Sequence, residues 1–261
     1  MGYQPFDLTG RAVLVTGGNG GIGYGMAEAL LQAGASVAIW GTRPEKTERA
    51  RLALVQACGD AARVHAFGCD VGDEDALEDT FERTLQALGG RLDACFANAG
   101  VSGFNTPLLD ASLEEWRRIQ RVNVEGVFLT FRAAARHMKA GGHGGSLVAT
   151  ASTAALEGAA RNSAYGASKG AVTSFVRALA VELARYKIRV NAILPGWIVS
   201  EMTQRSIFEN RKFADAVLPR IPARRWGEKE DFGGIAVYLA SSASSYTTGE
   251  QFVIDGGYTK F

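Results

Sequence analysis

Short apolar runs alternate with longer amphipathic stretches along the whole chain. The apolar runs are continuous rather than alternating in polarity, which is typical of strands in a parallel sheet covered on both faces. This pattern predicts seven strands, at residues 12–16, 36–40, 63–67, 92–97, 146–151, 188–194 and 251–254. It predicts helices between them at residues 22–33, 44–57, 74–88, 112 to about 137, 164–186 and 229–240.

The alternation of strands and helices predicts an α/β fold, a doubly wound Rossmann-like parallel sheet of about seven strands with helices on both faces. No linker, repeat or low-complexity tract interrupts it, so we expect one domain over residues 1–261. The longest irregular stretch runs from Pro195 to about Arg225 and holds three of the six prolines. A connection of this length is often a functional lid, and we expect a substrate loop at about 197–225.

Composition narrows the possible partners. The 261 residues are 47% hydrophobic and 21% charged, with a formal net charge of +1. A nearly neutral chain argues against a basic nucleic-acid surface, and no apolar run approaches the roughly 20 residues that span a bilayer. We therefore expect a small-molecule substrate rather than a nucleic acid or a membrane.

Cysteine and histidine usage indicates the compartment and the chemistry. The three cysteines, Cys58, Cys69 and Cys95, are odd in number and show no paired spacing. The first residues lack the basic start and apolar stretch of a signal peptide, so we expect a cytoplasmic protein without disulfides. The three histidines are scattered without the spacing of metal ligands, and we expect no metal.

A glycine-rich segment, Thr16-Gly17-Gly18-Asn19-Gly20-Gly21-Ile22-Gly23, joins the first predicted strand to the first predicted helix. Glycines let the backbone turn tightly and approach a pyrophosphate, and the free N–H groups at a helix start favour an anion. Two spacings fit, Gly17-x-x-x-Gly21-x-Gly23 and Gly17-x-x-Gly20-x-x-Gly23. The segment predicts a dinucleotide site.

The end of the second strand bears on the type of dinucleotide. An acid there would bind the ribose hydroxyls of NAD, whereas a base would accommodate the phosphate of NADP. The sequence is Trp40-Gly41-Thr42-Arg43-Pro44, with a base and no acid. Arg43 therefore favours NADP(H), and NAD(H) stays open because nothing basic lies inside the glycine loop.

Two further strand ends are candidate cofactor contacts. Asp70, before Val71, could bond the adenine amino group, although an aspartate that caps a helix is the rival interpretation. The small residues of Asn98-Ala99-Gly100 would let a cofactor lie close to the backbone, or they form an ordinary turn.

Tyr165 and Lys169 lie four residues apart, so they share one face of the predicted helix 164–186. A cation beside a phenol lowers the pKa of the phenol and makes it usable as an acid or base near neutral pH. Ser152, thirteen residues before the tyrosine, could hold a substrate oxygen. Each residue alone is most often structural, but their combination with the glycine loop indicates acid–base chemistry beside a dinucleotide.

The chain resembles the single-domain type of the short-chain dehydrogenase/reductase family, over nearly its whole length from Thr16 to Gly257. The matching pieces are Thr16-Gly17-x-x-x-Gly21-x-Gly23, Asn98-Ala99-Gly100, Asn123, Ser152, Tyr165-x-x-x-Lys169 and Pro195-Gly196. The resemblance implies binding of the cofactor by Gly17, Asn19, Gly21, Ile22, Gly23, Arg43, Asp70, Val71, Asn98, Ala99, Gly100, Tyr165, Lys169, Pro195, Gly196, Ile198 and Ser200. Ser200 stands where the family usually has threonine, and it keeps the hydroxyl.

The resemblance also implies catalytic roles. Tyr165 would give a proton to a carbonyl oxygen as hydride arrives, or remove it during alcohol oxidation. Lys169 would lower the pKa of Tyr165 and bond the nicotinamide ribose, and Ser152 would orient and polarise the substrate oxygen. Asn123 would hold a water that links Lys169 to solvent. The family usually assembles through its two long helices, so we expect a homotetramer.

The leading prediction is an oxidoreductase that transfers a hydride between NADP(H) and a ketone or secondary alcohol. The alternatives are a 3-oxoacyl-[acyl-carrier-protein] reductase, an NAD-dependent polyol dehydrogenase and a non-catalytic dinucleotide sensor. A sugar-nucleotide epimerase or dehydratase is disfavoured, because little chain follows Leu194 to form a substrate domain. Apolar candidates for lining the substrate pocket are Phe104, Leu156, Trp197, Met202, Ile207 and Phe208.

Overall fold

A computed structural model of the chain describes residues 4–103, 106–204, 207 and 209–260. Its centre is one sheet of seven strands in the order β3-β2-β1-β4-β5-β6-β7, and every neighbouring pair is parallel. The strands are β1 (Ala12–Thr16), β2 (Ser36–Gly41), β3 (Val64–Gly68), β4 (Ala94–Ala97), β5 (Gly145–Thr150), β6 (Ile188–Pro195) and β7 (Gln251–Ile254). The predicted sheet is confirmed, and no strand end differs from its predicted position by more than two residues.

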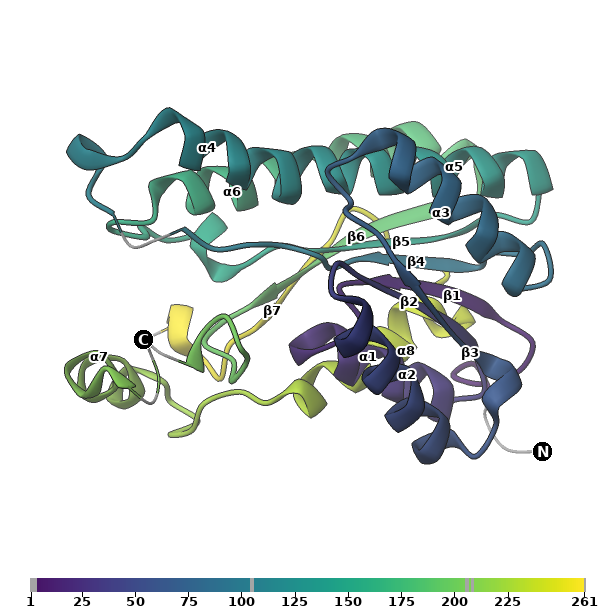
Figure 1. Cartoon of the computed structure of the whole chain (residues 1–261), viewed down its shortest axis with the longest axis horizontal. Helices are drawn as coiled ribbons and strands as arrows, with labels where there is room; N and C mark the ends of the chain where they lie inside the picture. Colours follow the sequence, from purple (N-terminus) through teal and green to yellow (C-terminus); the bar gives the residue numbers. More distant parts are fainter. Residues whose placement is uncertain (1–3, 104–105, 205–206, 208, 261) are drawn as a thin grey trace.

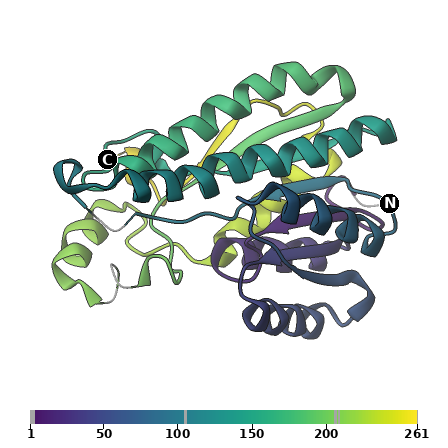
Figure 2. The ribbon, with the colours of Figure 1, turned by 45° about the horizontal axis from the view of Figure 1, so that its top comes forward.

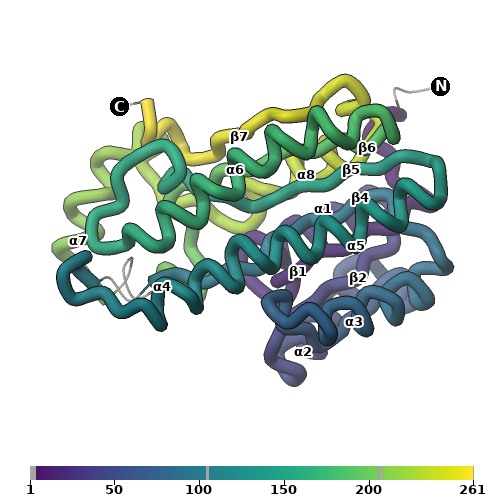
Figure 3. Tube along the Cα trace, turned by 90° about the horizontal axis from the view of Figure 1, so that it is seen from above, coloured from purple at the N-terminus to yellow at the C-terminus, as the bar shows by residue number. Residues whose placement is uncertain are grey.

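Helices cover both faces of the sheet (Figures 1 and 2). One face carries α1 (Gly21–Gln32), α2 (Pro44–Cys58) and α8 (Gly233–Ala240). The other carries α3 (Glu74–Ala87), α4 (Leu113–Gln120), α5 (Gly126–Gly141) and α6 (Ser163–Leu183). Seen from above, α6 runs beside α4 and α5 (Figure 3). The predicted doubly wound fold is therefore confirmed.

The two faces have separate apolar cores, which explains why the strands read as continuous apolar runs. Along β1, Leu14 packs into the core beneath α3, α5 and α6, whereas Val13 and Val15 pack into the core beneath α1, α2 and α8. All three side chains are fully buried. A strand buried on both faces has no polar alternate positions, as the sequence pattern predicts.

The prediction of a single helix over residues 112–137 is wrong. The structure divides it into α4 and α5 by a single π-helical turn, Arg121–Glu125, and α5 continues to Gly141. Inside this turn the buried Asn123 accepts a hydrogen bond from Val101 N and donates one to Val101 O, at 2.8 and 2.9 Å. The spacing of apolar positions does not reveal a single π-helical turn, because the helical pattern continues on both sides of it.

The predicted irregular segment after β6 also needs correction. It contains α7 (Arg211–Val217), where the Asn210 side chain caps the start by accepting a hydrogen bond from Phe213 N at 3.1 Å. The predicted helix 229–240 begins as a 3₁₀ turn, Lys229–Phe232, before α8. An asparagine before a helix start, as Asn210 is here, was the sequence signal that could have predicted α7.

The order of the strands places the functional end of the molecule. The chain winds outward from β1 to β3 and then crosses back to β4, so the winding direction reverses between β1 and β4. In open α/β sheets ligands bind in the crevice at the carboxyl ends of the strands beside such a reversal. The glycine loop follows β1, and Asn98 follows β4, so both lie at this crevice.

Candidate active site

The glycine loop is folded so tightly that side chains would not fit at two positions. A Cβ on Gly23 would lie 2.3 Å from the carbonyl oxygen of Gly17. Gly17 itself has φ of +64°, and a Cβ there would lie 2.9 Å from Ala99 Cα. The close approach of β1, α1 and the end of β4 therefore requires glycine at both positions.

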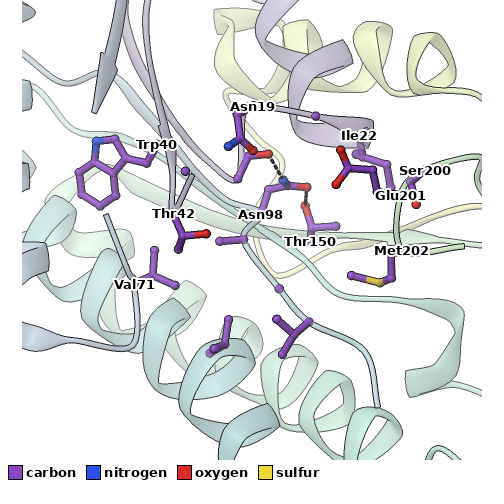
Figure 4. A pocket seen from close by; sticks show the side chains of 18 of the residues that line it. Asn19, Ile22, Trp40, Thr42, Val71, Asn98, Thr150, Ser200, Glu201 and Met202 are labelled. Carbon is purple, nitrogen blue, oxygen red and sulfur yellow. Dashed lines mark hydrogen bonds between the residues drawn. The ribbon is translucent and has the colours of Figure 1, made fainter. Parts of the chain in front are cut away.

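Asn98 joins the carboxyl ends of three strands. Its Nδ2 donates to the carbonyl oxygen of Thr16 at 3.1 Å. Its Oδ1 accepts from the hydroxyl of Thr150 at 3.1 Å (Figure 4). The hydroxyl of Thr16 accepts from the backbone N–H groups of Asn98 and Ala99, both at 3.0 Å. The Asn98 side chain thus holds the floor of the crevice together across β1, β4 and β5.

A cavity of about 580 Å³ extends from the glycine loop to the end of β5 (Figure 4). The structure brings most of the predicted site residues together in its wall: Gly17, Asn19, Gly21, Ile22, Arg43, Asp70, Val71, Asn98, Ala99, Gly100, Ser152, Tyr165, Lys169, Pro195, Gly196, Ile198 and Ser200. Gly23 and Asn123 are the two predicted residues that do not line it. Both lie behind the wall, where each supports a loop that does.

Asp70 organises the loop after β3. Its Oδ1 accepts from Gly72 N at 3.0 Å, and its Oδ2 accepts from Arg121 Nη2 at 2.9 Å. The cap of α3 is Asp73, whose Oδ1 accepts from Ala76 N at 3.1 Å. Helix capping, the rival interpretation of Asp70, is therefore wrong, and contact with an adenine ring stays a prediction.

Tyr165, Ser152 and Lys169 meet at the far end of the cavity. Tyr165 and Lys169 lie on α6, and Ser152 follows β5. Tyr165 and Ser152 both line the cavity wall there. The Lys169 ammonium lies 5.6 Å from the centre of the Tyr165 ring and donates to the Thr150 carbonyl oxygen at 2.7 Å.

Burial governs the titration of this pair. Burial raises the pKa of Tyr165, and the hydrogen bond with Ser152 opposes this effect without reversing it. Burial likewise lowers the pKa of Lys169 to about 8. The net direction for Tyr165 is opposite to the lowering expected from the sequence, because loss of solvation outweighs the stabilisation of the phenolate in this structure.

Asn123 supports the catalytic helix through a short chain of bonds. Besides its two bonds to Val101, its Nδ2 donates to Ser168 Oγ at 3.0 Å, and that hydroxyl donates to the carbonyl oxygen of Tyr165 at 2.7 Å. Both amide hydrogens of Asn123 therefore have protein partners. The water-holding role stays a prediction, and the side chain itself ties the loop after β4 to α6.

The segment after β6 folds back over the glycine loop. A Cβ on Gly21 would lie 3.3 Å from Ser200 Cβ. The Ser200 hydroxyl is 3.1 Å from the hydroxyl of Thr203, which also bonds the carbonyl oxygen of Ile198. This places the hydroxyl expected near a nicotinamide at the cavity wall, where Thr203 holds it.

The candidates for the substrate pocket separate in the structure. Met202 lines the main cavity, Trp197 lines a second, smaller one, Ile207 is buried and Leu156 is exposed. Phe104 and Phe208 lie outside the described residues. Among the four candidates that the structure describes, only Met202 lines the main cavity.

Sequence reasoning missed four charged residues of the cavity wall, Lys46, Arg118, Arg121 and Glu201. Lys46 lies three residues after Arg43 in the first turn of α2, and this spacing was a usable signal. Glu201 had no comparable local signal. The uncharged polar residues Thr42 and Thr150 of the wall were also missed.

Neither a metal centre nor a membrane span is found in the described part of the chain. No group of three or more histidine, cysteine or acidic residues there could hold a metal ion. None of the described helices combines the length and apolar character that crossing a bilayer requires. Cys58, Cys69 and Cys95 are all free thiols.

The chain matches known proteins over nearly its whole length. A family model described as enoyl-(acyl carrier protein) reductase matches residues 17–259. The sorbose reductase of Schizosaccharomyces pombe is 35% identical over 258 residues, which cover 97% of each chain.

Solved structures agree with these sequence matches. A short-chain type dehydrogenase/reductase from Mycobacterium marinum is 38% identical, with a TM-score of 0.90 over 98% of both chains. A gluconate 5-dehydrogenase from Burkholderia cenocepacia, in complex with NADP and tartrate, is 31% identical with a TM-score of 0.91. That alignment covers 99% of this chain and 98% of the other.

Proposed function

Because this chain belongs to the short-chain dehydrogenase/reductase family, we propose that it transfers a hydride between NADP(H) and a ketone or secondary alcohol, with Tyr165 as the general acid/base. The predicted family and the predicted class of enzyme, an oxidoreductase, are confirmed by the matches. The observation that carries the proposal is that Ser152, Tyr165 and Lys169 lie together in the wall of the cavity that begins at the glycine loop.

The residues present fit a dinucleotide. Backbone that excludes a Cβ at Gly17 and Gly23 leaves N–H groups at the start of α1 open to a pyrophosphate. Arg43 and Lys46 add two cations to the same wall, which supports the phosphorylated cofactor. When bound, the nicotinamide would supply or accept the hydride.

Tyr165 is suited to give a proton. Its raised pKa keeps the phenol protonated near neutral pH, so the hydroxyl can donate to a carbonyl oxygen that develops negative charge. Ser152 would donate a second hydrogen bond to that oxygen and stabilise the same charge. In alcohol oxidation the same proton would move back to the phenolate.

Lys169 would stabilise the phenolate that remains. At neutral pH an amine with a pKa of about 8 is mostly protonated, so a positive charge lies beside Tyr165 when its proton leaves. Anchoring of Lys169 to Thr150 keeps that charge in place. We propose that Asn123, between the loop after β4 and α6, holds a water that links Lys169 to solvent, so that protons can be resupplied.

Polyhydroxylated ketones are the first substrates to test. The sorbose reductase and gluconate 5-dehydrogenase named above support this class. We propose that the segment 197–225 is the substrate loop, within one dinucleotide-binding and catalytic domain that spans the chain. Met202 and Thr203 on this segment already line the cavity.

The test is cofactor consumption with sugars, diketones, aryl ketones and 3-oxoacyl or enoyl esters. Tyr165→Phe should reduce turnover by roughly two or more orders of magnitude, the usual scale for losing a general acid. Near-normal turnover by this variant would contradict the role of Tyr165. Dinucleotide binding without turnover on any substrate would favour the sensor instead.

The choice of cofactor has its own test. Arg43→Ala should weaken binding of NADPH more than binding of NADH, because only NADPH carries a phosphate on the adenosine ribose. Equal weakening of both would contradict the assignment of Arg43 and favour an NAD-dependent polyol dehydrogenase.

We also propose a homotetramer in a reducing, cytoplasmic compartment. Apolar side chains lie exposed on the paired helices, including Trp116 on α4, Phe128 on α5 and the 83% exposed Val181 on α6. The three free cysteines support the compartment. Light scattering on the purified chain tests the assembly, and a monomer would contradict it.

A further inference from the structure

One carboxylate joins two cations at the mouth of the cavity. Glu201 Oε2 lies 2.5 Å from Arg43 Nη2, and Glu201 Oε1 lies 2.7 Å from Lys46 Nζ. The two cations follow β2, whereas Glu201 follows β6, 158 residues after Arg43. The bridge therefore connects the segment after β2, which is expected to bind the adenosine ribose, with the segment after β6, which is expected to cover the substrate.

The bridge lies directly on the glycine loop. A Cβ on Gly20 would be 2.8 Å from Lys46 Nζ, so the ammonium touches the loop itself. The neighbouring Gly21 faces Ser200, next to Glu201. All of these residues line the main cavity, and Figure 4 shows Ile22, Ser200, Glu201 and Met202 on the same side of it.

The cations have the geometry of an anion site that is already filled. Each oxygen of one carboxylate contacts a different cation, and the Lys46 side chain is only 19% exposed. The hydrogen bond from Lys46, and then the one from Arg43, hold the pKa of Glu201 below its usual range. A phosphate monoester, with up to two charges and three acceptor oxygens, would satisfy the same two cations at least as well.

We propose that the Glu201 carboxylate occupies the place of the 2′-phosphate of NADP(H), so that binding of this cofactor exchanges the carboxylate for the phosphate on Arg43 and Lys46. Lys46 is then a second residue that recognises the phosphate. Glu201 lowers the affinity for NADP(H) because the bridge must break first, whereas NAD(H) has no phosphate to make the exchange. This inference rests on the proposed use of NADP(H).

Binding of nucleotide fragments tests the exchange without turnover. Titration calorimetry on the full chain would compare 2′,5′-ADP, which carries the phosphate, with 5′-AMP, which does not. Glu201→Gln should tighten 2′,5′-ADP by about three- to tenfold, the range expected for a mostly exposed charge, and change 5′-AMP by less than twofold. Lys46→Met should weaken 2′,5′-ADP by a similar factor.

Glu48→Gln is the matched control. Glu48 is an exposed carboxylate on α2, the helix that carries Lys46, and it pairs with Arg51. This variant should change the binding of neither fragment. Suppose that the wild type binds both fragments tightly, but Glu201→Gln binds 2′,5′-ADP no better than the wild type does. That result would overturn the exchange and leave the dinucleotide function standing. Failure of the wild type to bind either fragment would contradict both proposals.

Discussion

The ammonium group of Lys169 donates a hydrogen bond to the carbonyl oxygen of Thr150, with 2.7 Å between the two atoms. Thr150 is the last residue of β5, and its hydroxyl is bonded to Asn98 at the end of β4. The lysine is thereby fixed to the same strand ends that form the floor of the cavity. Its position beside Tyr165 is set by the sheet as well as by the four-residue spacing on α6.

The buried charge of Lys169 should be visible in the pH dependence of stability. Its pKa is about 8 in the folded chain against 10.5 in the unfolded one, so the unfolded state binds more protons between these values. The wild type should therefore gain about 2 kcal/mol, relative to Lys169→Met, as the pH rises from 8 towards 10.5.

Urea unfolding of both proteins between pH 7 and pH 10 measures this difference, and the cysteines cancel because both proteins keep them. Lys212→Met, at an exposed position on α7, is the control and should give a flat difference. A flat difference for Lys169→Met as well would show that the lysine is not desolvated in the fold.

Ser152→Ala should change the pH profile as well as the rate. The bond from Ser152 opposes the effect of burial on Tyr165, so its removal raises the pKa of Tyr165 further. Alcohol oxidation needs the phenolate, and its rate should therefore rise with pH along a limb shifted to higher pH in the variant. Turnover should also fall by roughly 10²-fold, through loss of a donor to the substrate oxygen.

Steady-state rates from pH 6 to pH 10 check the Ser152 prediction. Ser242→Ala, at an exposed position outside the cavity, should leave the profile unchanged. A rate loss in Ser152→Ala with no displacement of the limb would indicate a role in holding substrate alone.

Gly23→Ala should damage the dinucleotide site. The added Cβ would meet a backbone oxygen at 2.3 Å, which no side-chain rotation relieves, so we expect a loss of about 1–3 kcal/mol in the free energy of unfolding. Cofactor binding should weaken at least tenfold. Gly234→Ala on α8 has nothing within 4 Å and should stabilise the chain by about 0.5–1 kcal/mol. Thermal unfolding and NADPH titration of both variants test the contrast.

Asp93 should contribute stability that acid removes. Burial alone would raise its pKa, but hydrogen bonds from Arg91, Ala12 N and Arg11 hold the pKa below its usual value. The contribution is present above the unfolded pKa, near 4, and is lost as pH falls through the lower folded value. Asp93→Asn should cost about 1–3 kcal/mol at pH 7, and less in acid.

Urea unfolding at pH 7 and pH 3 checks the Asp93 prediction, with the exposed Asp79→Asn as control. Equal losses for Asp93→Asn at both pH values would mean that its charge does not stabilise the fold.

Local patterns in the sequence determined the sheet, the dinucleotide loop and the spacing of Tyr165 and Lys169. Each of these depends on neighbours within one turn or one strand: continuous apolar runs require burial on both faces, and Gly17 to Gly23 forms one tight connection. The wide turn at Asn123 escaped this reasoning, because a helical pattern continues on both sides of it.

Only the tertiary structure decided the contacts between segments far apart in the chain. The order of the strands brings Glu201 onto Arg43 and Lys46, and it places Asn98 where it can join three strand ends. It also places Tyr165 where loss of solvation, rather than the nearby lysine, sets the direction of its pKa. Solvation and long-range ion pairs depend on which segments pack together, and this information is absent from the spacing of residues along the chain.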